Sequence, residues 1–169
     1  MVQPHDPSLF QRLKGRRSTL FLAALTLLVL LVSVPGSLRV AYQRGGFYLF
    51  SREFLEDIPK RLAGPGKFRF VLQPLIAVIL GIGGGRRDAR AGRPPFLYGV
   101  AFHRTHRKDL LSSGVETLAN LLLMGVLMDS IFQWILLGNS HPGAALVIGP
   151  VLIVLPYSLA RSLSNHLIR

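Results

Sequence analysis

The feature that most constrains this 169-residue chain is a pair of long apolar stretches without any charged side chain. No Asp, Glu, Lys or Arg lies between Arg17 and Arg39, and none lies between Asp129 and Arg161. Stretches of this length that are rich in Leu, Val and Ile are typical of membrane-spanning helices. Charged residues make up 17% of the chain, whereas soluble domains carry roughly 25%. The sequence therefore excludes an ordinary soluble enzyme. The absence of cysteine also excludes a disulfide-stabilised secreted domain.

The first apolar stretch is expected to be a transmembrane helix over residues 18–34 that ends at Pro35-Gly36. It follows a basic segment, residues 1–17, which we place in the cytoplasm. A basic segment before an apolar run also describes a signal peptide. Because no A-x-A-like cleavage site follows the run, we interpret it as an uncleaved membrane anchor.

Residues 35–69 form an amphipathic segment that we expect outside the cytoplasm. Within it, Phe47, Phe50, Phe54 and Ile58 recur at helical spacing. This pattern fits a helix that lies in the membrane interface. A helix packed against the protein's own membrane domain would give the same pattern, so both interpretations stay open.

The rest of the chain, residues 70–169, is expected to be a membrane domain of three parts. Residues 70–84 form a short span, or a re-entrant segment, because they include Gln73 and Pro74. An Arg-rich cytoplasmic loop follows over residues 85–114. Residues 115–163 then form a helical hairpin around a short polar turn.

The predicted fold is thus all-α, with four transmembrane helices and one interfacial amphipathic helix. If residues 70–84 do not cross the membrane, the number of spans falls to three and the N-terminus lies outside. With four spans and both termini inside, thirteen of the twenty lysines and arginines lie in cytoplasmic segments. Because cytoplasmic loops carry an excess of basic residues, we prefer the four-span orientation.

Asp129 is the ionisable residue that the membrane environment makes hardest to explain. It lies near the middle of the third predicted span, where an unpaired charge costs several kcal/mol. Nothing basic in the following span lies at that depth. We therefore expect its partner to come from Gln133, from elsewhere in the protein, or from another subunit.

A second polar group is predicted at the cytoplasmic end of the hairpin. Counting outward from the turn at 1.5 Å per residue places Arg161 close to Glu116 and Asn120, with His166 at the same level. We interpret this group as a structural contact between two helices.

The Arg-rich loop is the candidate surface for lipid headgroups. Its bases flank apolar stretches, which favours anionic lipid over nucleic acid as their partner. The residues concerned are Arg86, Arg87, Arg90 and Arg93. A glycine cluster at 81–85 lacks the pattern of a dinucleotide or phosphate loop, so we expect it to end a helix.

No metal or cofactor site is predicted. His103 and His106 lie three residues apart, but no cysteine or carboxylate pair completes a tetrahedral zinc site. Arg104, Arg107 and Lys108 would also repel a cation.

Two segments resemble a family of small bacterial integral-membrane proteins without assigned activity. They are RRDARAGRPPFLYG at 86–99 and HPGAALVIGPVLIVLPYSLARSLSN at 141–165. The resemblance extends over about residues 69–169 and implies a location in the bacterial cytoplasmic membrane. It implies no activity and no catalytic residue.

The sequence predicts a non-catalytic accessory, assembly or scaffold subunit of a larger membrane complex, whether respiratory, photosynthetic or transport-related. Its expected partners are phospholipid, other membrane subunits or further copies of itself. The alternative hypothesis is an oligomeric transporter or proton-conducting protein that uses Asp129. A lipid-modifying enzyme is a third possibility, but the chain has no recognisable pair of acid and base.

Overall fold

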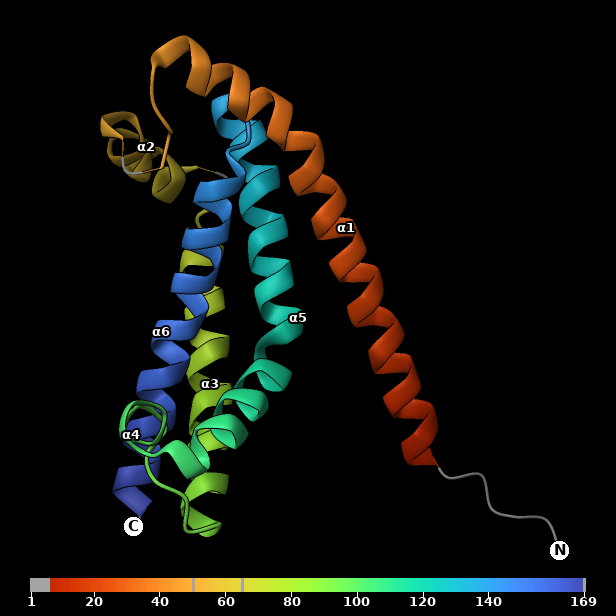
Figure 1. Cartoon of the computed structure of the whole chain (residues 1–169), viewed down its shortest axis with the longest axis vertical. Helices are drawn as coiled ribbons and strands as arrows, with labels where there is room; N and C mark the ends of the chain where they lie inside the picture. The colour runs from red at the N-terminus through yellow and green to blue at the C-terminus, as the bar shows by residue number, and fades with distance from the viewer. Residues whose placement is uncertain (1–6, 50, 65, 169) are drawn as a thin grey trace, which may run out of the picture.

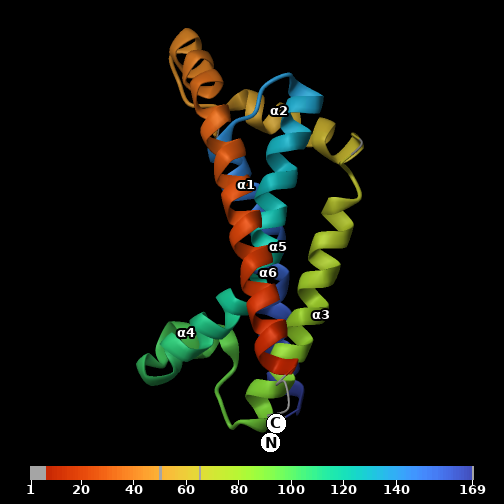
Figure 2. The same ribbon diagram turned by 90° about the vertical axis from the view of Figure 1, so that its right-hand side faces the viewer.

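The protein is all-helical throughout the residues that the computed structural model describes, which are 7–49, 51–64 and 66–168, with side chains from residue 17 onward. These residues form six helices: α1 (Pro7–Arg44), α2 (Arg52–Ala63), α3 (Arg69–Arg90), α4 (Phe96–Phe102), α5 (Arg104–Leu137) and α6 (Pro142–Ile168). The helices α3, α5 and α6 run side by side, and α1 contacts α5 and α6 (Figures 1 and 2). We call the end with α2 the outer end and the end with α4 the inner end.

Four of these helices, α1, α3, α5 and α6, are long and apolar enough to cross a membrane. This agrees with an all-α membrane protein. The first described turn of α1 and the last of α6 lie at the same end of the molecule (Figure 1). The number of helices that actually cross, and the side on which each end lies, stay predictions.

Helix α1 does not end at Pro35-Gly36, so that expected boundary was wrong. The helix continues through Pro35 and ends at Arg44, before Gly45, which has a left-handed φ of 68°. Its polar residues Thr26 and Ser33 form hydrogen bonds within the helix. Their hydroxyls donate to the backbone carbonyls of Leu22 and Val29, each at 2.7 Å. A proline inside a membrane helix is tolerated when neighbouring groups compensate for the lost hydrogen bond.

Helix α3 is also longer than the predicted 70–84. Its 22 residues correspond to about 33 Å of helix, which matches a hydrocarbon core of about 30 Å. The expectation that the glycine cluster ends this helix was wrong. The glycines remain part of the helix, and they allow the backbone of α3 to approach that of α6.

The pair α3–α6 makes the most extensive helix contact among the described residues. Ala77, Gly81 and Gly85 lie four residues apart on α3, and all three are buried. A Cβ atom on Gly81 would lie 2.6 Å from the carbonyl oxygen of Tyr157, and one on Gly85 would overlap the hydroxyl of Ser164. Small residues at this spacing are the usual means by which membrane helices pack closely. We call this contact the glycine seam.

Helix α2 lies across the outer end of the bundle (Figure 2). The hydroxyl of Ser51 caps its first turn by accepting from the backbone N–H of Phe54 at 3.2 Å. Phe54 is buried, and Ile58 packs beside it against the outer ends of α5 and α6. One face of α2 thus contacts the protein's own helices, as in the second interpretation. Phe47 is exposed, and Phe50 lies outside the described residues.

The predicted hairpin is present, but the predicted loop before it is mostly helical. Helix α5 ends at Leu137, and Gly138 caps it in the left-handed region. At its other end α5 begins at Arg104 rather than at residue 115, and α4 occupies residues 96–102. No proline interrupts the segment 104–114, so the span continues as a polar helix beyond its apolar part.

The glycine seam gives a direct test of the fold. We expect Gly85→Ala to lower the melting temperature in detergent, because the new methyl group must push α6 away at a typical cost of about 1–3 kcal/mol. Gly83→Ala is the matched control, since a Cβ atom there meets nothing within 4 Å. That variant should be neutral or slightly stabilising. Equal melting temperatures for the two variants would contradict the seam.

Candidate functional site

The outer end of the bundle holds a buried carboxylate between two guanidinium groups. Asp129 of α5 has no exposed surface. One nitrogen of Arg61, Nη1, lies 3.2 Å from each of its oxygens, and Nη2 of Arg69 also donates to it. The amide of Gln133 donates to the second oxygen at 2.6 Å. The partners of Asp129 thus come from Gln133 and from elsewhere in the chain, which are two of the sources that the sequence left open. Arg61 and Arg69 come from α2 and the start of α3, which the depth count within the hairpin did not include.

A chain of hydrogen bonds continues from Arg61 to the surface. Nη2 of Arg61 donates to the hydroxyl of Tyr48 at 3.2 Å, and that hydroxyl donates to Asp57 at 2.8 Å. Lys60 then donates to the other oxygen of Asp57 at 2.7 Å. The four buried charges at this end of the described structure, on Asp57, Arg61, Arg69 and Asp129, sum to zero. We call these residues, with Tyr48, Lys60, Gln133 and His141, the outer cluster.

The turn between α5 and α6 belongs to the outer cluster as well. The side-chain oxygen of Gln133 accepts from the backbone N–H of His141 at 2.8 Å. The imidazole of His141 stacks on the ring of Tyr48, with centroids 3.8 Å apart and planes 13° from parallel. The cluster therefore connects α2, α3, α5 and the turn in one network.

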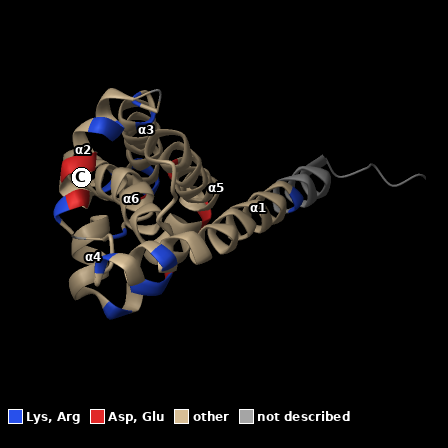
Figure 3. Ribbon diagram, turned by 90° about the horizontal axis from the view of Figure 1, so that it is seen from above, with Lys and Arg blue, Asp and Glu red and all other residues tan. Residues whose placement is uncertain are grey.

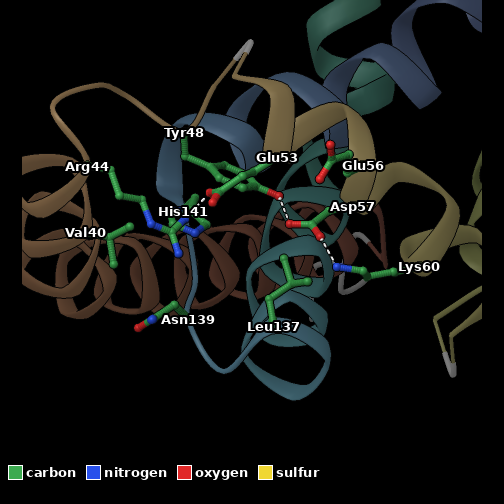
Figure 4. A pocket seen from close by; sticks show the side chains of 10 residues that line it. All are labelled: Val40, Arg44, Tyr48, Glu53, Glu56, Asp57, Lys60, Leu137, Asn139 and His141. Atoms are coloured by element: carbon green, nitrogen blue, oxygen red, sulfur yellow. Dashed lines mark hydrogen bonds and ion pairs between the residues drawn. The ribbon is translucent and has the colours of Figure 1, made fainter.

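A cavity of about 280 Å³ opens beside this network (Figure 4). It lies between the last turns of α1, helix α2 and the α5–α6 turn. Its lining residues are Val40, Arg44, Tyr48, Glu53, Glu56, Asp57, Lys60, Leu137, Asn139 and His141. Arg44 and Glu53 form an ion pair across it.

Four of the titratable groups that line the cavity have shifted pKa values. Burial raises the pKa of Tyr48 to about 12. Burial also lowers the pKa of His141 below its usual 6.5, helped by the charges of Arg61 and Arg44. For Asp57, burial acts to raise the pKa, but hydrogen bonds from Lys60 and Tyr48 outweigh it and lower the pKa. The hydrogen bond to Asp57 raises the pKa of Lys60.

These directions argue against general acid–base chemistry in the cavity. A catalytic acid or base works best when its pKa lies near the working pH, and each of the four shifts moves the group away from neutrality. The described residues also include no group of three His, Asp or Glu side chains able to hold a metal ion. The arrangement is suited to holding helices in place.

A second charge cluster lies at the inner end around Arg161, which is 2% exposed. Its Nε donates to Asp88 of α3 at 2.6 Å, and its Nη2 donates to the hydroxyl of Ser113 at 2.8 Å. Its Nη1 donates to the hydroxyl of Tyr157 at 2.9 Å. The guanidinium also lies over the ring of Phe96, 4.6 Å from its centroid. We call these residues the inner cluster.

The predicted contact of Arg161 with Glu116 and Asn120 is not formed. Both residues are exposed, as is His166, and Glu116 instead accepts from the hydroxyl of Ser112 at 3.3 Å. The reason is the glycine seam, which brings α3 and its Asp88 closer to Arg161 than α5 brings Glu116. Sequence reasoning missed Asp88 because it lies among the arginines of a stretch interpreted as a loop.

The predicted lipid-headgroup residues lie at the inner end of α3 and just beyond it. Arg86, Arg87 and Arg90 are exposed and form no ion pair with the described residues. Arg93 is partly buried and lies 3.6 Å from Asp88.

Comparison with known proteins adds no family to this description. No protein-family model, no curated protein and no solved structure matches the chain.

The outer cluster makes Asp129 a determinant of stability. We expect Asp129→Asn to destabilise the purified protein strongly, because removing one partner of a buried ion pair typically costs about 3–5 kcal/mol. Thermal unfolding in detergent measures the loss. Asp109→Asn on the same helix is the control, since Asp109 is exposed and forms no ion pair among the described residues. In the double variant with Arg69→Met, the loss should be smaller than the sum of the single losses. Additive losses would contradict the pairing.

The lowered pKa of His141 predicts a loss of stability in acid. As the pH falls, His141 takes up a proton at a pH of about 6.5 in the unfolded chain, but only at a lower pH in the folded protein. The contribution of the neutral His141 to the free energy of unfolding is therefore complete above pH 6.5 and falls as the pH drops below it. We expect His141→Phe, which keeps the stacking on Tyr48, to show a flatter melting temperature between pH 5 and 7. Parallel profiles for the two proteins would count against this role. The exposed His103 and His166 and the partly buried His106 are present in both proteins.

Proposed function

We propose that this chain is a non-catalytic accessory, assembly or scaffold subunit of a larger complex in the bacterial cytoplasmic membrane, with both termini in the cytoplasm. The observation that carries the proposal is the exposure of α1. Only 11% of the residues in its most apolar window are buried, against 33% in each of the other three long helices. Seen along the bundle, α1 runs outward from the other helices (Figure 3).

The contact between α1 and the bundle uses small side chains. Thr26 and Ser33 are buried, and the hydroxyl of Thr26 lies 3.3 Å from the carbonyl oxygen of Leu123 on α5. At 100° per residue, Leu28 and Leu31 lie on the opposite face, and each is 58% exposed. This large apolar face suits contact with a helix of a neighbouring subunit as well as with lipid.

The state of the buried charges favours a structural role. Both oxygens of Asp129 accept hydrogen bonds from Arg61, and Asp88 is bound to Arg161. Hydrogen-bond donors of the protein thus occupy both oxygens of Asp129 and one oxygen of Asp88, which suits a contact that holds helices together. The alternative of proton conduction through Asp129 therefore finds no favourable observation.

The proposed orientation follows from the basic residues. The inner end holds Arg86, Arg87 and Arg90 of α3 and the start of α5, and the first described turn of α1 lies at the same end. An excess of bases on one side is typical of the cytoplasmic side. Seven lysines and arginines lie between residues 39 and 69, toward the outer end, and two of them, Arg61 and Arg69, form ion pairs there.

The test is extraction of native membranes with a mild detergent, followed by native gels and mass spectrometry. We expect stoichiometric comigration with larger subunits. A triple variant on the exposed face of α1, Leu20→Ala with Leu28→Ala and Leu31→Ala, should reduce that comigration at least several-fold, because its partner loses apolar contact area.

The matched control replaces three exposed residues of α3, namely Leu72→Ala with Leu75→Ala and Ile79→Ala, which are 52–60% exposed. This variant should retain the partner. Migration of the unmodified chain alone, or equal loss in both triple variants, would refute the proposal.

A further inference from the structure

An apolar groove of about 460 Å³ runs along the inner half of the α3–α6 pair. Its walls include Val78, Ile82 and Arg86 of α3 and Leu163, Leu167 and Ile168 of α6. The groove is separate from both charge clusters, since none of these residues takes part in either of them. It lies on two helices that are apolar enough to cross a membrane.

The groove exists because of the glycine seam. At Gly81 and Gly85 the two backbones approach so closely that the larger side chains stand on either side of the contact. The one hydroxyl in the groove wall, that of Ser164, donates to the carbonyl of Ile82 at 3.1 Å. Its polarity is thus satisfied inside the protein, and the surface left to an occupant is apolar.

One end of the groove carries an uncompensated positive charge. Arg86 lines it, is exposed and forms no ion pair with the described residues. The nearest acidic residue in the sequence, Asp88, is 2% exposed and bound to Arg161. Arg86 therefore has its guanidinium available to an anion at the depth where the helix leaves the membrane.

These observations together select an occupant. Between two membrane helices the groove is surrounded by acyl chains, and a base at its end matches a phosphate group at the headgroup level. A guanidinium can bind a phosphate through two hydrogen bonds. A helix in the groove would have to bring its own carboxylate to Arg86. We infer that the groove binds one anionic phospholipid, with its phosphate on Arg86 and one acyl chain along the seam.

The experiment titrates the purified protein with phosphatidylglycerol or phosphatidylcholine and counts bound lipids by native mass spectrometry. We expect one molecule of phosphatidylglycerol to bind tightly and phosphatidylcholine to bind with lower affinity. Arg86→Gln should lower the affinity for phosphatidylglycerol by about five-fold, which is the usual contribution of one base near a membrane surface. Arg90→Gln is the control, because Arg90 is equally exposed and unpaired but does not line the groove.

Two further variants fill the groove. Val78→Trp should abolish the tight lipid, whereas Ile79→Trp, on the neighbouring residue that is 60% exposed, should retain it. If Val78→Trp does not fold, Leu167→Trp serves the same purpose, since Leu167 is 81% exposed. Because the readout is the lipid count of the isolated chain, it is independent of the proposed subunit role.

Three results would overturn the inference. Equal affinity for the two lipids would remove the role of the net negative charge of the headgroup, since both lipids carry a phosphate. Equal weakening by Arg86→Gln and Arg90→Gln would indicate diffuse attraction to the basic surface. A groove-filling variant that keeps the lipid would place the lipid outside the groove, and one that instead changes the oligomeric state would identify a second copy of the chain as the occupant.

Discussion

The pairing of buried charges is the constraint on which the whole arrangement depends. Inside a membrane an unpaired ionised side chain costs several kcal/mol, so each one must find an opposite charge or strong hydrogen bonds. Asp129 forms ion pairs with Arg61 and Arg69, and Asp88 forms one with Arg161. The first set joins α2, α3 and α5 at the outer end, and the second joins α3 and α6 at the inner end. Helix α3 takes part in both and is thereby fixed at its two ends.

Between these two ends, α3 is held by shape and not by charge. The glycine seam brings its backbone against α6, and this close contact determines which polar side chains can meet. It places Asp88 beside Arg161 and leaves Glu116 on the surface. Packing of small residues and pairing of charges are therefore linked at the inner end, where the close approach of α3 and α6 brings Asp88 to Arg161.

The sequence was informative about elements and much less so about partners. Long uncharged stretches predicted the spans, and burial of a carboxylate was enough to single out Asp129. Two helix boundaries were wrong because Pro35 and the glycines near Gly85 were interpreted as breaks, although neighbouring helices can compensate for both. The arginines that hydrogen-bond to Asp129 and Asp88 lie 60 to 73 residues away in the chain. A depth count within one hairpin cannot find contacts at such separations, since they depend on how separate helices dock.

The order of the pairs along the chain has a consequence for biogenesis. Arg61 and Arg69 precede Asp129, so during synthesis the outer acid enters the membrane after both of its partners. The inner pair has the reverse order, because Asp88 is made early and Arg161 lies in the last helix. Asp88 thus stays without its main partner until α6 is inserted. A nascent chain that has not yet inserted α6 exposes this carboxylate near the membrane surface. The exposed carboxylate distinguishes unfinished from finished protein for any membrane chaperone or protease that binds such groups.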